Sequence, residues 1–293
     1  MAYKNMHVPV LFREVVEMLN LRHNGRYIDA TVGLGGHAAG ILEGIGEKGL
    51  LMGIDRDQSA LDLAAERLSD KRAVLCRGSF SDIAELASEL NVEEFDGILF
   101  DLGTSMLQMK DMQRGFSFNS EDRLDMRMDD TQDVSAWEIV NRYRQEELEK
   151  IIKEYGEDPF ARRIARTIVN ARKIKNIDTC SELAGIILKA CGRHGKTHPA
   201  TRTFQALRIE VNRELEQLMK GLSVSAGMLK KGGRLCVISY HSLEDRIVKN
   251  FFRDSSKQGL LKVLTKKPVV PQRDEVRQNP SARSAKLRGA EKI

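Results

Sequence analysis

The first third of the chain alternates short apolar runs with amphipathic stretches. Strand-like runs end near Thr31, Asp55, Phe80 and Asp101, and helical spacing of apolar residues lies between them, over His37–Glu43, Ser59–Leu68 and Ile83–Leu90. This order predicts an α/β fold, a doubly wound parallel sheet with helices on both faces. Because parallel strands end at one edge of such a sheet, any ligand is expected at that edge.

After Gly103 the strand pattern stops. Apolar residues then recur at helical spacing over Arg142–Tyr155, Pro159–Lys173, Thr179–Cys191 and Thr201–Leu222. A further strand is predicted over Lys231–Tyr240. A doubly wound fold needs about one helix before its fifth strand. We therefore predict an all-helical domain, residues 105–214, inserted into a domain formed by residues 1–104 and 215–293, and we expect the insert to select the substrate.

Composition supports a folded intracellular protein. The chain has 293 residues, is 41% hydrophobic and carries a net charge of +5, which hints at a polyanionic partner. Its four cysteines include no C-x-x-C pair, so we expect reduced thiols, a cytoplasmic location and no metal site. No apolar stretch is long enough to span a membrane, and the N-terminus lacks the apolar core of a signal peptide.

The glycine-rich segment Asp29–His37 follows the first predicted strand. Gly33, Gly35 and Ala38 match the dinucleotide pattern G-x-G-x-x-G/A, and Asp55 follows Gly35 by 20 residues, the spacing of a ribose-binding carboxylate. Asp29 favours a different cofactor, S-adenosylmethionine, because an acid suits its ammonium and sulfonium groups but repels a pyrophosphate. A tight glycine turn without a ligand is the third interpretation.

Other polar residues are predicted at the same edge. Asp101 ends the fourth strand, where it could hold a cofactor ammonium, accept a proton from an acceptor amine or cap a loop, and Gln108 could reach the same pocket. Phe80 ends the third strand, where facing adenine and packing in the core are both open. The polar run Ser239–Arg246 suggests either a site or a helix N-terminus.

Basic residues form two clusters. Arg162, Arg163 and Arg166 fall near one face of a predicted helix in a stretch without acids, so they are candidate phosphate contacts or a solvated helix face. Arg202 is predicted to line a cleft. Residues 266–293 hold eight Lys/Arg, three Asp/Glu and three prolines. This composition predicts an extended basic arm partly laid over the fold, or a solvated tail, with Arg283 and Arg288 as RNA contacts.

Taken together, the motifs resemble the bacterial 16S rRNA (cytosine-N(4))-methyltransferase family, ribosomal RNA small subunit methyltransferase H. The resemblance runs almost end to end. It is carried by HVPV (7–10), DATVGLGGH (29–37), GIDRD (53–57), DGILFDLG (96–103), RGFSF (114–118), LDMRM (124–128), ATRTFQALRI (200–209), HSLEDR (241–246) and RSAKLR (283–288). Each motif is weak alone, and the ordered set is specific.

The resemblance implies a class I, Rossmann-like methyltransferase domain with a helical insert. It also implies S-adenosylmethionine-dependent methylation of the N(4) amine of a decoding-site (P-site) cytidine in 16S rRNA, on the assembled small subunit. The sequence leaves both a monomer and a homodimer open. The cofactor-binding positions that carry over are Gly35, Gly36, His37, Asp55, Phe80, Asp101 and Gln108. Asp101 is also the candidate catalytic residue.

One loop departs from the family pattern. The family usually has Ser-Ser-Pro-Gln after Asp-Leu-Gly-Val, whereas this chain has TSMLQ over 104–108. This departure keeps a non-catalytic role in view, and the glycine pattern keeps a second enzyme class in view. A nicotinamide-dependent oxidoreductase would use Gly33, Gly35 and Ala38, and a non-catalytic ribosome-assembly factor would bind rRNA without transferring a methyl group.

Overall fold

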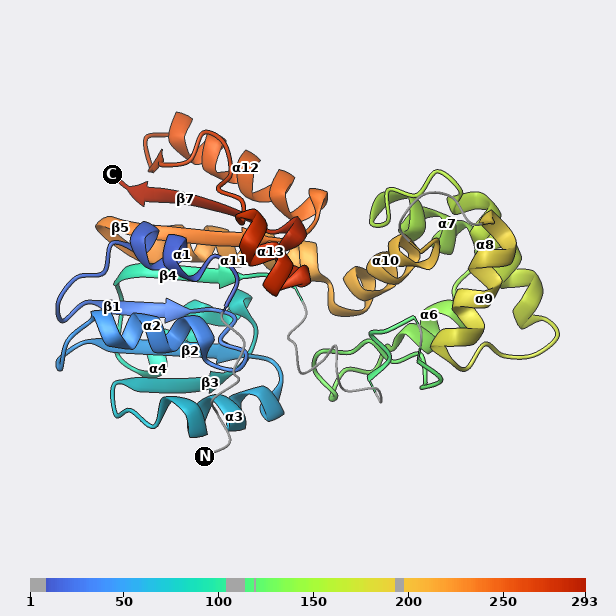
Figure 1. Ribbon diagram of the computed structural model, residues 1–293, viewed down its shortest axis with the longest axis horizontal. Coiled ribbons are helices and arrows are strands. Elements are labelled where there is room, and N and C mark those ends of the chain that lie inside the picture. Colours follow the sequence, from blue (N-terminus) through green and yellow to red (C-terminus); the bar gives the residue numbers. More distant parts are fainter. Residues whose placement is uncertain (1–8, 104–113, 119, 193–197) are drawn as a thin grey trace. The chain divides into compact units, whose positions relative to one another are not determined.

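A computed structural model describes residues 9–103, 114–118, 120–192 and 198–293 of the chain. The chain forms two compact units (Figure 1). The first unit comprises Met1–Gly103 and Leu215–Ile293, and the second comprises Thr104–Glu214. Each unit has its own hydrophobic core, so each is described separately.

The first unit is built on a seven-stranded sheet with the order β3-β2-β1-β4-β5-β7-β6. Its strands are β1 (Arg26–Asp29), β2 (Leu50–Asp55), β3 (Ala73–Arg77), β4 (Phe95–Asp101), β5 (Leu229–Ser239), β6 (Leu261–Val263) and β7 (Lys286–Lys292). Strands β1 to β5 are parallel, and β7 runs antiparallel to both β5 and β6. The predicted doubly wound α/β fold is confirmed.

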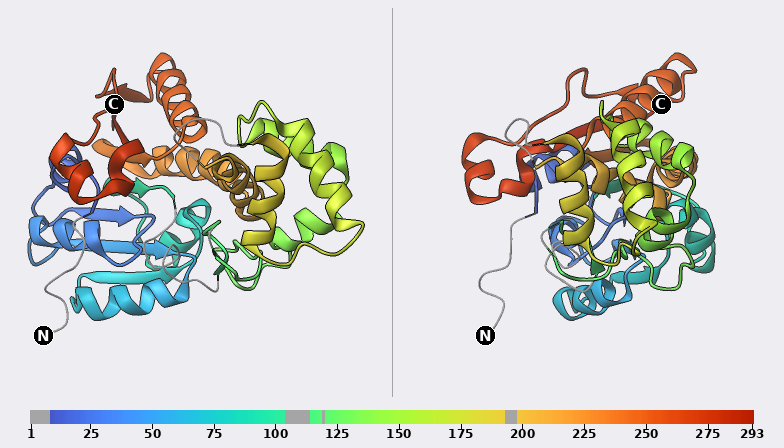
Figure 2. Two further views of the ribbon diagram at one scale, coloured as in Figure 1. Left: turned by 45° about the vertical axis from the view of Figure 1, so that its right-hand side comes forward. Right: turned by 90° about the vertical axis from the view of Figure 1, so that its right-hand side faces the viewer.

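Helices cover both faces of this sheet (Figure 1, Figure 2). One face packs against α1 (Phe12–Leu19), α2 (Gly36–Gly44) and α3 (Gln58–Leu68). The other packs against α4 (Ile83–Glu89), α11 (Glu214–Met228) and α12 (Ser242–Lys257). Side chains of β4 alternate between the two faces. Leu99 packs on the face covered by α1, α2 and α3, and Ile98 and Phe100 pack on the face covered by α4, α11 and α12. Two short elements, α13 (Arg273–Gln278) and η3 (Pro280–Ser284), precede β7.

The second unit is helical in its described part. It contains α6 (Ala136–Arg142), α7 (Gln145–Glu154), α8 (Ala161–Arg172), α9 (Cys180–Cys191) and α10 (Ala200–Asn212). The helix predicted over Thr201–Leu222 is split in the structure. The helix predicted over Arg142–Tyr155 corresponds to α7, and α6 is a separate helix before it that the pattern did not predict. The chain is extended at Tyr143 between α6 and α7, and Arg213 has a left-handed backbone, with φ 48°, between α10 and α11. Neither break is marked by Gly or Pro, the residues that usually signal one.

The C-terminal prediction is wrong. Residues 286–292 are not an arm laid over the fold but a strand, β7, that lies between β5 and β6 in the sheet. Leu287 and Ala290 are fully buried on opposite faces of the sheet. Residues 287–290 are all buried, and the charged residues in and around them conceal the strand in the sequence.

Smaller differences concern strand ends. The third strand ends at Arg77, and Phe80 opens a 3-10 helix, η1 (Phe80–Asp82), instead of ending β3. The polar run after β5 is the start of α12, so the helix N-terminus interpretation is confirmed there.

None of the described helices combines the length and apolar composition needed to cross a bilayer.

Leu287→Ala tests the position of β7. Leu287 is 0% exposed, and we expect its truncation to lower the free energy of unfolding by about 2–5 kcal/mol, because it leaves a cavity in the sheet core. Leu260→Ala is the matched control, since Leu260 is 45% exposed and should change stability by less than about 0.5 kcal/mol. Chemical denaturation measures both. Equal, small effects would mean that the segment lies loosely on the surface.

Candidate active site

The glycine loop joins β1 to α2 at the carboxyl edge of the sheet. Gly35 precedes α2 with φ 73°, a left-handed conformation that favours glycine. A Cβ on Gly36 would lie 2.5 Å from Cγ of Pro9, so the N-terminal segment leaves no room for a side chain there. Helix α2 has no side-chain N-cap, and the backbone N–H of Ala38 in its first turn interacts with the carboxylate of Asp29 and opposes the rise of its pKa.

Three carboxylates meet beside this loop. Asp29, Asp55 and Asp101 end β1, β2 and β4, which are neighbours in the sheet. The backbone N–H of Gly33 donates to Oδ2 of Asp55 at 2.9 Å, and this bond ties the glycine loop to β2. Asp29 is 1% exposed and accepts a hydrogen bond from the N–H of Thr31 at 3.2 Å. The predicted acids are therefore brought to one place.

Burial changes the protonation of these acids. It raises the pKa of Asp29 to about 7, with a smaller contribution from repulsion by Asp101 and Asp55. It also raises the pKa of Asp101 to about 7, against the opposing effect of a hydrogen bond from Tyr240, and it raises the pKa of Asp55. A bound cation would favour the ionised carboxylates, so the edge is suited to a positively charged ligand.

His37 lies in the first turn of α2, facing Asp101. Its Nε2 is 3.6 Å from Oδ2 of Asp101, and the ring stacks beside Phe12 with centroids 6.1 Å apart. Burial lowers the pKa of His37 to about 4, so the ring is neutral at pH 7. The side chain is 5% exposed, and neither ring nitrogen makes a hydrogen bond of standard geometry with the described residues, although the backbone of Val10 lies near enough to oppose the lowering of the pKa. A buried polar group in this state is a candidate for ligand contact.

Phe80 packs on the other side of the sheet edge. Its ring meets Phe100 edge-on with centroids 5.5 Å apart, and the guanidinium of Arg56 lies 5.5 Å from its centroid. Phe80 is half-buried and packs against the edge of the core, and its contact with adenine stays a prediction. Gln108 and the divergent 104–108 loop lie outside the described residues.

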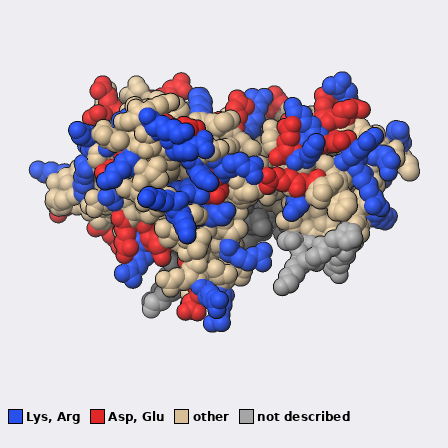
Figure 3. All heavy atoms as spheres, turned by 90° about the horizontal axis from the view of Figure 1, so that it is seen from above, with Lys and Arg blue, Asp and Glu red and all other residues tan. Residues whose placement is uncertain are grey.

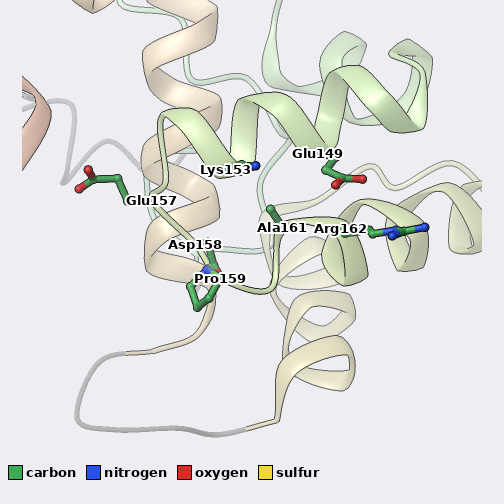
Figure 4. A pocket seen from close by; sticks show the side chains of 7 residues that line it. All are labelled: Glu149, Lys153, Glu157, Asp158, Pro159, Ala161 and Arg162. Atoms are coloured by element: carbon green, nitrogen blue, oxygen red, sulfur yellow. The ribbon is translucent and has the colours of Figure 1, made fainter.

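The arginines of the second unit lie on α8. Arg162, Arg163 and Arg166 are exposed, and their side chains form no ion pair with described residues. Arg162 also lines a pocket of about 440 Å³ with Glu149, Lys153 and Asp158 (Figure 4). The acids on this pocket make it a poor site for a polyanion. Arg163 and Arg166 are therefore the better candidates for phosphate contact.

The remaining RNA-contact candidates differ in exposure. Arg202 is exposed, and its guanidinium donates to the carbonyl of Glu157 at 3.0 Å. Arg283 is exposed in η3. Arg288 is 6% exposed and donates from Nε to Asp245 at 2.7 Å, so its prediction as an RNA contact is corrected to an internal ion pair. Lys and Arg are spread over the face seen in Figure 3, with Asp and Glu between them.

Two residues of this edge were missed as site residues in the sequence. Thr31 accepts the N–H of Asp101 through Oγ1 at 2.6 Å, and the hydroxyl of Tyr240 donates to Oδ1 of Asp101 at 2.8 Å. The polar run after β5 was a signal for Tyr240. No local pattern predicts its pairing with Asp101, because the two residues are far apart in sequence.

Comparison with known proteins decides the family. The model of the MraW methylase family matches residues 4–293. This chain belongs to the MraW methylase family. Ribosomal RNA small subunit methyltransferase H from Persephonella marina is 51% identical, with 98% of this chain and 99% of that protein covered. The protein of the same name from Caldicellulosiruptor bescii is 48% identical, with the same coverage. The family resemblance seen in the sequence is confirmed.

A solved structure supports the fold of this MraW methylase. A candidate rRNA-methylase from Clostridium thermocellum matches with a TM-score of 0.50 at 13% identity, covering 98% of this chain and 100% of that one. At this identity the match supports the fold alone. Family membership makes the chain a methyltransferase, which argues against the oxidoreductase interpretation of the glycine loop.

Asp101→Asn tests the buried carboxylates without a substrate. A raised pKa means that ionising Asp101 weakens the folded state as pH rises from about 4 to about 7. The variant should therefore gain about 1–2 kcal/mol of unfolding free energy at pH 8 and little at pH 4, because solvent at the 24% exposed side chain screens part of the effect. Denaturation of the ligand-free protein at both pH values measures this. A loss of stability at pH 8 would contradict it.

Proposed function

We propose that this MraW methylase transfers a methyl group from S-adenosylmethionine to the exocyclic N(4) amine of a decoding-site (P-site) cytidine in 16S rRNA, on the assembled small subunit. The observation that carries the proposal is the meeting of the glycine loop with Asp29, Asp55 and Asp101 in a member of this family. The rRNA substrate is supported by the printed name of the relatives, ribosomal RNA small subunit methyltransferase H.

The described residues fit this cofactor. The buried carboxylates Asp29 and Asp101 suit its ammonium and sulfonium charges. Asp55 would bind the ribose hydroxyls. Gly35 and Gly36 would allow close approach of the backbone, the buried ring of His37 would supply a polar contact, and Phe80 would border the adenine. Gln108 is assigned to the same pocket from the family pattern alone.

Methyl transfer to this amine is mainly a problem of positioning. The exocyclic nitrogen of cytosine shares its lone pair with the ring and is a poor nucleophile. When bound, S-adenosylmethionine supplies the electrophilic methyl group. Asp101 would accept a hydrogen bond from the amine and stabilise the positive charge that develops on it, and a pKa of about 7 also suits it to accept the proton. Correct alignment of the reactants can contribute about 7 kcal/mol or more.

The helical insert, residues 105–214, is assigned to substrate recognition in this proposal. Arg163 and Arg166 project from α8 without ion-pair partners among the described residues. These side chains would contact the phosphates of the RNA. The target cytidine must leave its stack to reach a buried carboxylate, which favours a nucleotide in a loop or junction over one in a helix.

Methyl transfer can be measured directly. The protein is incubated with radiolabelled S-adenosylmethionine and small ribosomal subunits from a strain that lacks the gene, and the label is mapped by nuclease digestion and mass spectrometry. We expect label on the N(4) amine of one cytidine and its loss in Asp101→Asn. Binding of the cofactor and rRNA without label would instead favour a ribosome-assembly factor. Label on another base or on protein would contradict the proposed substrate.

The double variant Arg163→Ala/Arg166→Ala tests the RNA surface. Loss of two phosphate contacts should weaken binding to rRNA roughly ten- to a hundred-fold at 0.1 M salt. It should also reduce the steepness of the slope of log K against log[salt] by about 2. Filter binding across a salt series measures both quantities. Lys150→Ala/Lys189→Ala removes the same charge from exposed positions on α7 and α9 and serves as the control. An equal effect in both variants would indicate general electrostatics instead of a specific surface.

A further inference from the structure

Tyr240 forms a hydrogen bond with the candidate catalytic carboxylate. It follows the last residue of β5, and its hydroxyl donates to Oδ1 of Asp101 at 2.8 Å. The backbone of Asp101 is fixed as well, because its N–H donates to Oγ1 of Thr31 at 2.6 Å. Oδ2 is left facing the ring of His37, whose Nε2 lies 3.6 Å away without a hydrogen bond. One carboxylate oxygen is therefore held by the Tyr240 hydroxyl, and the other lies beside His37, one of the candidate cofactor-binding residues.

Tyr240 is itself held on two sides. Its backbone N–H donates at 2.8 Å to Oε2 of Glu244, a carboxylate that is 2% exposed in the first turn of α12. On the other side its ring packs against Gly103, the residue that follows β4 by two positions, so closely that a Cβ there would lie 3.2 Å from Cδ2 of Tyr240. The phenol hydroxyl is thus fixed in place before any ligand binds.

We propose that Tyr240 is a positioning residue for methyl transfer, which orients the carboxylate of Asp101 so that Oδ2 faces the reacting groups. The inference rests on the proposed function for the role of Asp101. It adds a residue that holds the catalytic group without touching the substrate. Its chemistry is that of a neutral donor fixed against one oxygen of a buried carboxylate.

The same hydrogen bond affects the charge of Asp101. The titratable groups that face Asp101 come from four elements: Asp29 of β1, His37 of α2, Tyr240 after β5 and Glu244 of α12. Burial and Glu244 raise the pKa of Asp101, and the Tyr240 hydroxyl lowers it. Removing the hydroxyl should therefore raise this pKa further, so that less of the carboxylate is ionised at neutral pH.

Tyr240→Phe in the full-length protein tests this role. The rate of methylation of small subunits is measured from pH 5.5 to 9 as kcat/KM for S-adenosylmethionine. We expect the apparent pKa on the acidic side of the pH–rate profile to rise by about one unit. At pH values below this pKa, kcat/KM should then be roughly ten-fold lower than in the wild type, and at pH 9 it should approach the wild-type value. Replacing Tyr240 by 3-fluorotyrosine strengthens the donor and should move this apparent pKa in the opposite direction.

Tyr27→Phe is the matched control. Tyr27 is buried in β1, and its hydroxyl accepts a hydrogen bond from the N–H of Arg22 at 2.7 Å, at the opposite end of the strand from Asp29. This variant should be less stable than the wild type, and its apparent pKa on the acidic side of the pH–rate profile should be unchanged. A Tyr240→Phe profile lowered equally at every pH would overturn the proposal and leave Tyr240 a structural residue.

A second measurement separates this inference from the proposed function. Carboxyl NMR of the ligand-free protein follows the titration of Asp101, identified by loss of its signal in Asp101→Asn. A higher titration midpoint in Tyr240→Phe supports the coupling even if no methylation of rRNA is detected with the wild-type protein. An unchanged midpoint in a folded variant contradicts it.

Discussion

The crowding of acids at the carboxyl edge of the sheet is the constraint on which the site depends. The parallel pairing of β2, β1 and β4 places Asp55, Asp29 and Asp101 on adjacent strands, which lie about 4.8 Å apart. None of the three forms an ion pair with Lys or Arg in the described part of the chain. Asp29 is buried and Asp55 and Asp101 are half-buried, and carboxylates shielded from water without such partners are costly. The ionised carboxylates therefore destabilise the ligand-free fold, and a cationic ligand would offset this destabilisation.

The rest of the first unit holds these acids in place. Amide groups of the glycine loop bind Asp29 and Asp55, and Tyr240 binds Asp101. The C-terminal strand supports the site indirectly, through α12. Arg288 on β7 forms an ion pair with Asp245 in the first turn of α12, next to the residue that holds the backbone of Tyr240. The basic C-terminal segment therefore has a structural role close to the site, which its composition does not suggest.

How much the sequence predicts depends on the range of the interaction. The glycine loop and the acids at strand ends are local patterns, and both were predicted with the correct fold. The hydrogen bond between Tyr240 and Asp101 depends on the register of β4 against β5, where Asp101 lies opposite Ile238. Strand β7 was missed because its buried positions, such as Gly289, are interleaved with charged residues. The 104–108 loop stays a prediction, since it lies outside the described residues.

The two units divide the proposed work between them. The described cofactor candidates lie in the first unit, and the α8 arginines lie in the second, whose core is formed by its own residues, including Leu124, Ile152 and Ile168. Changes on the exposed face of α8 therefore leave the carboxylates and the glycine loop intact. Substitutions at independent sites that share no partners have nearly additive effects. A variant that alters both RNA affinity and the pH dependence of cofactor binding would consequently reveal energetic coupling between the units, which the separate cores do not require.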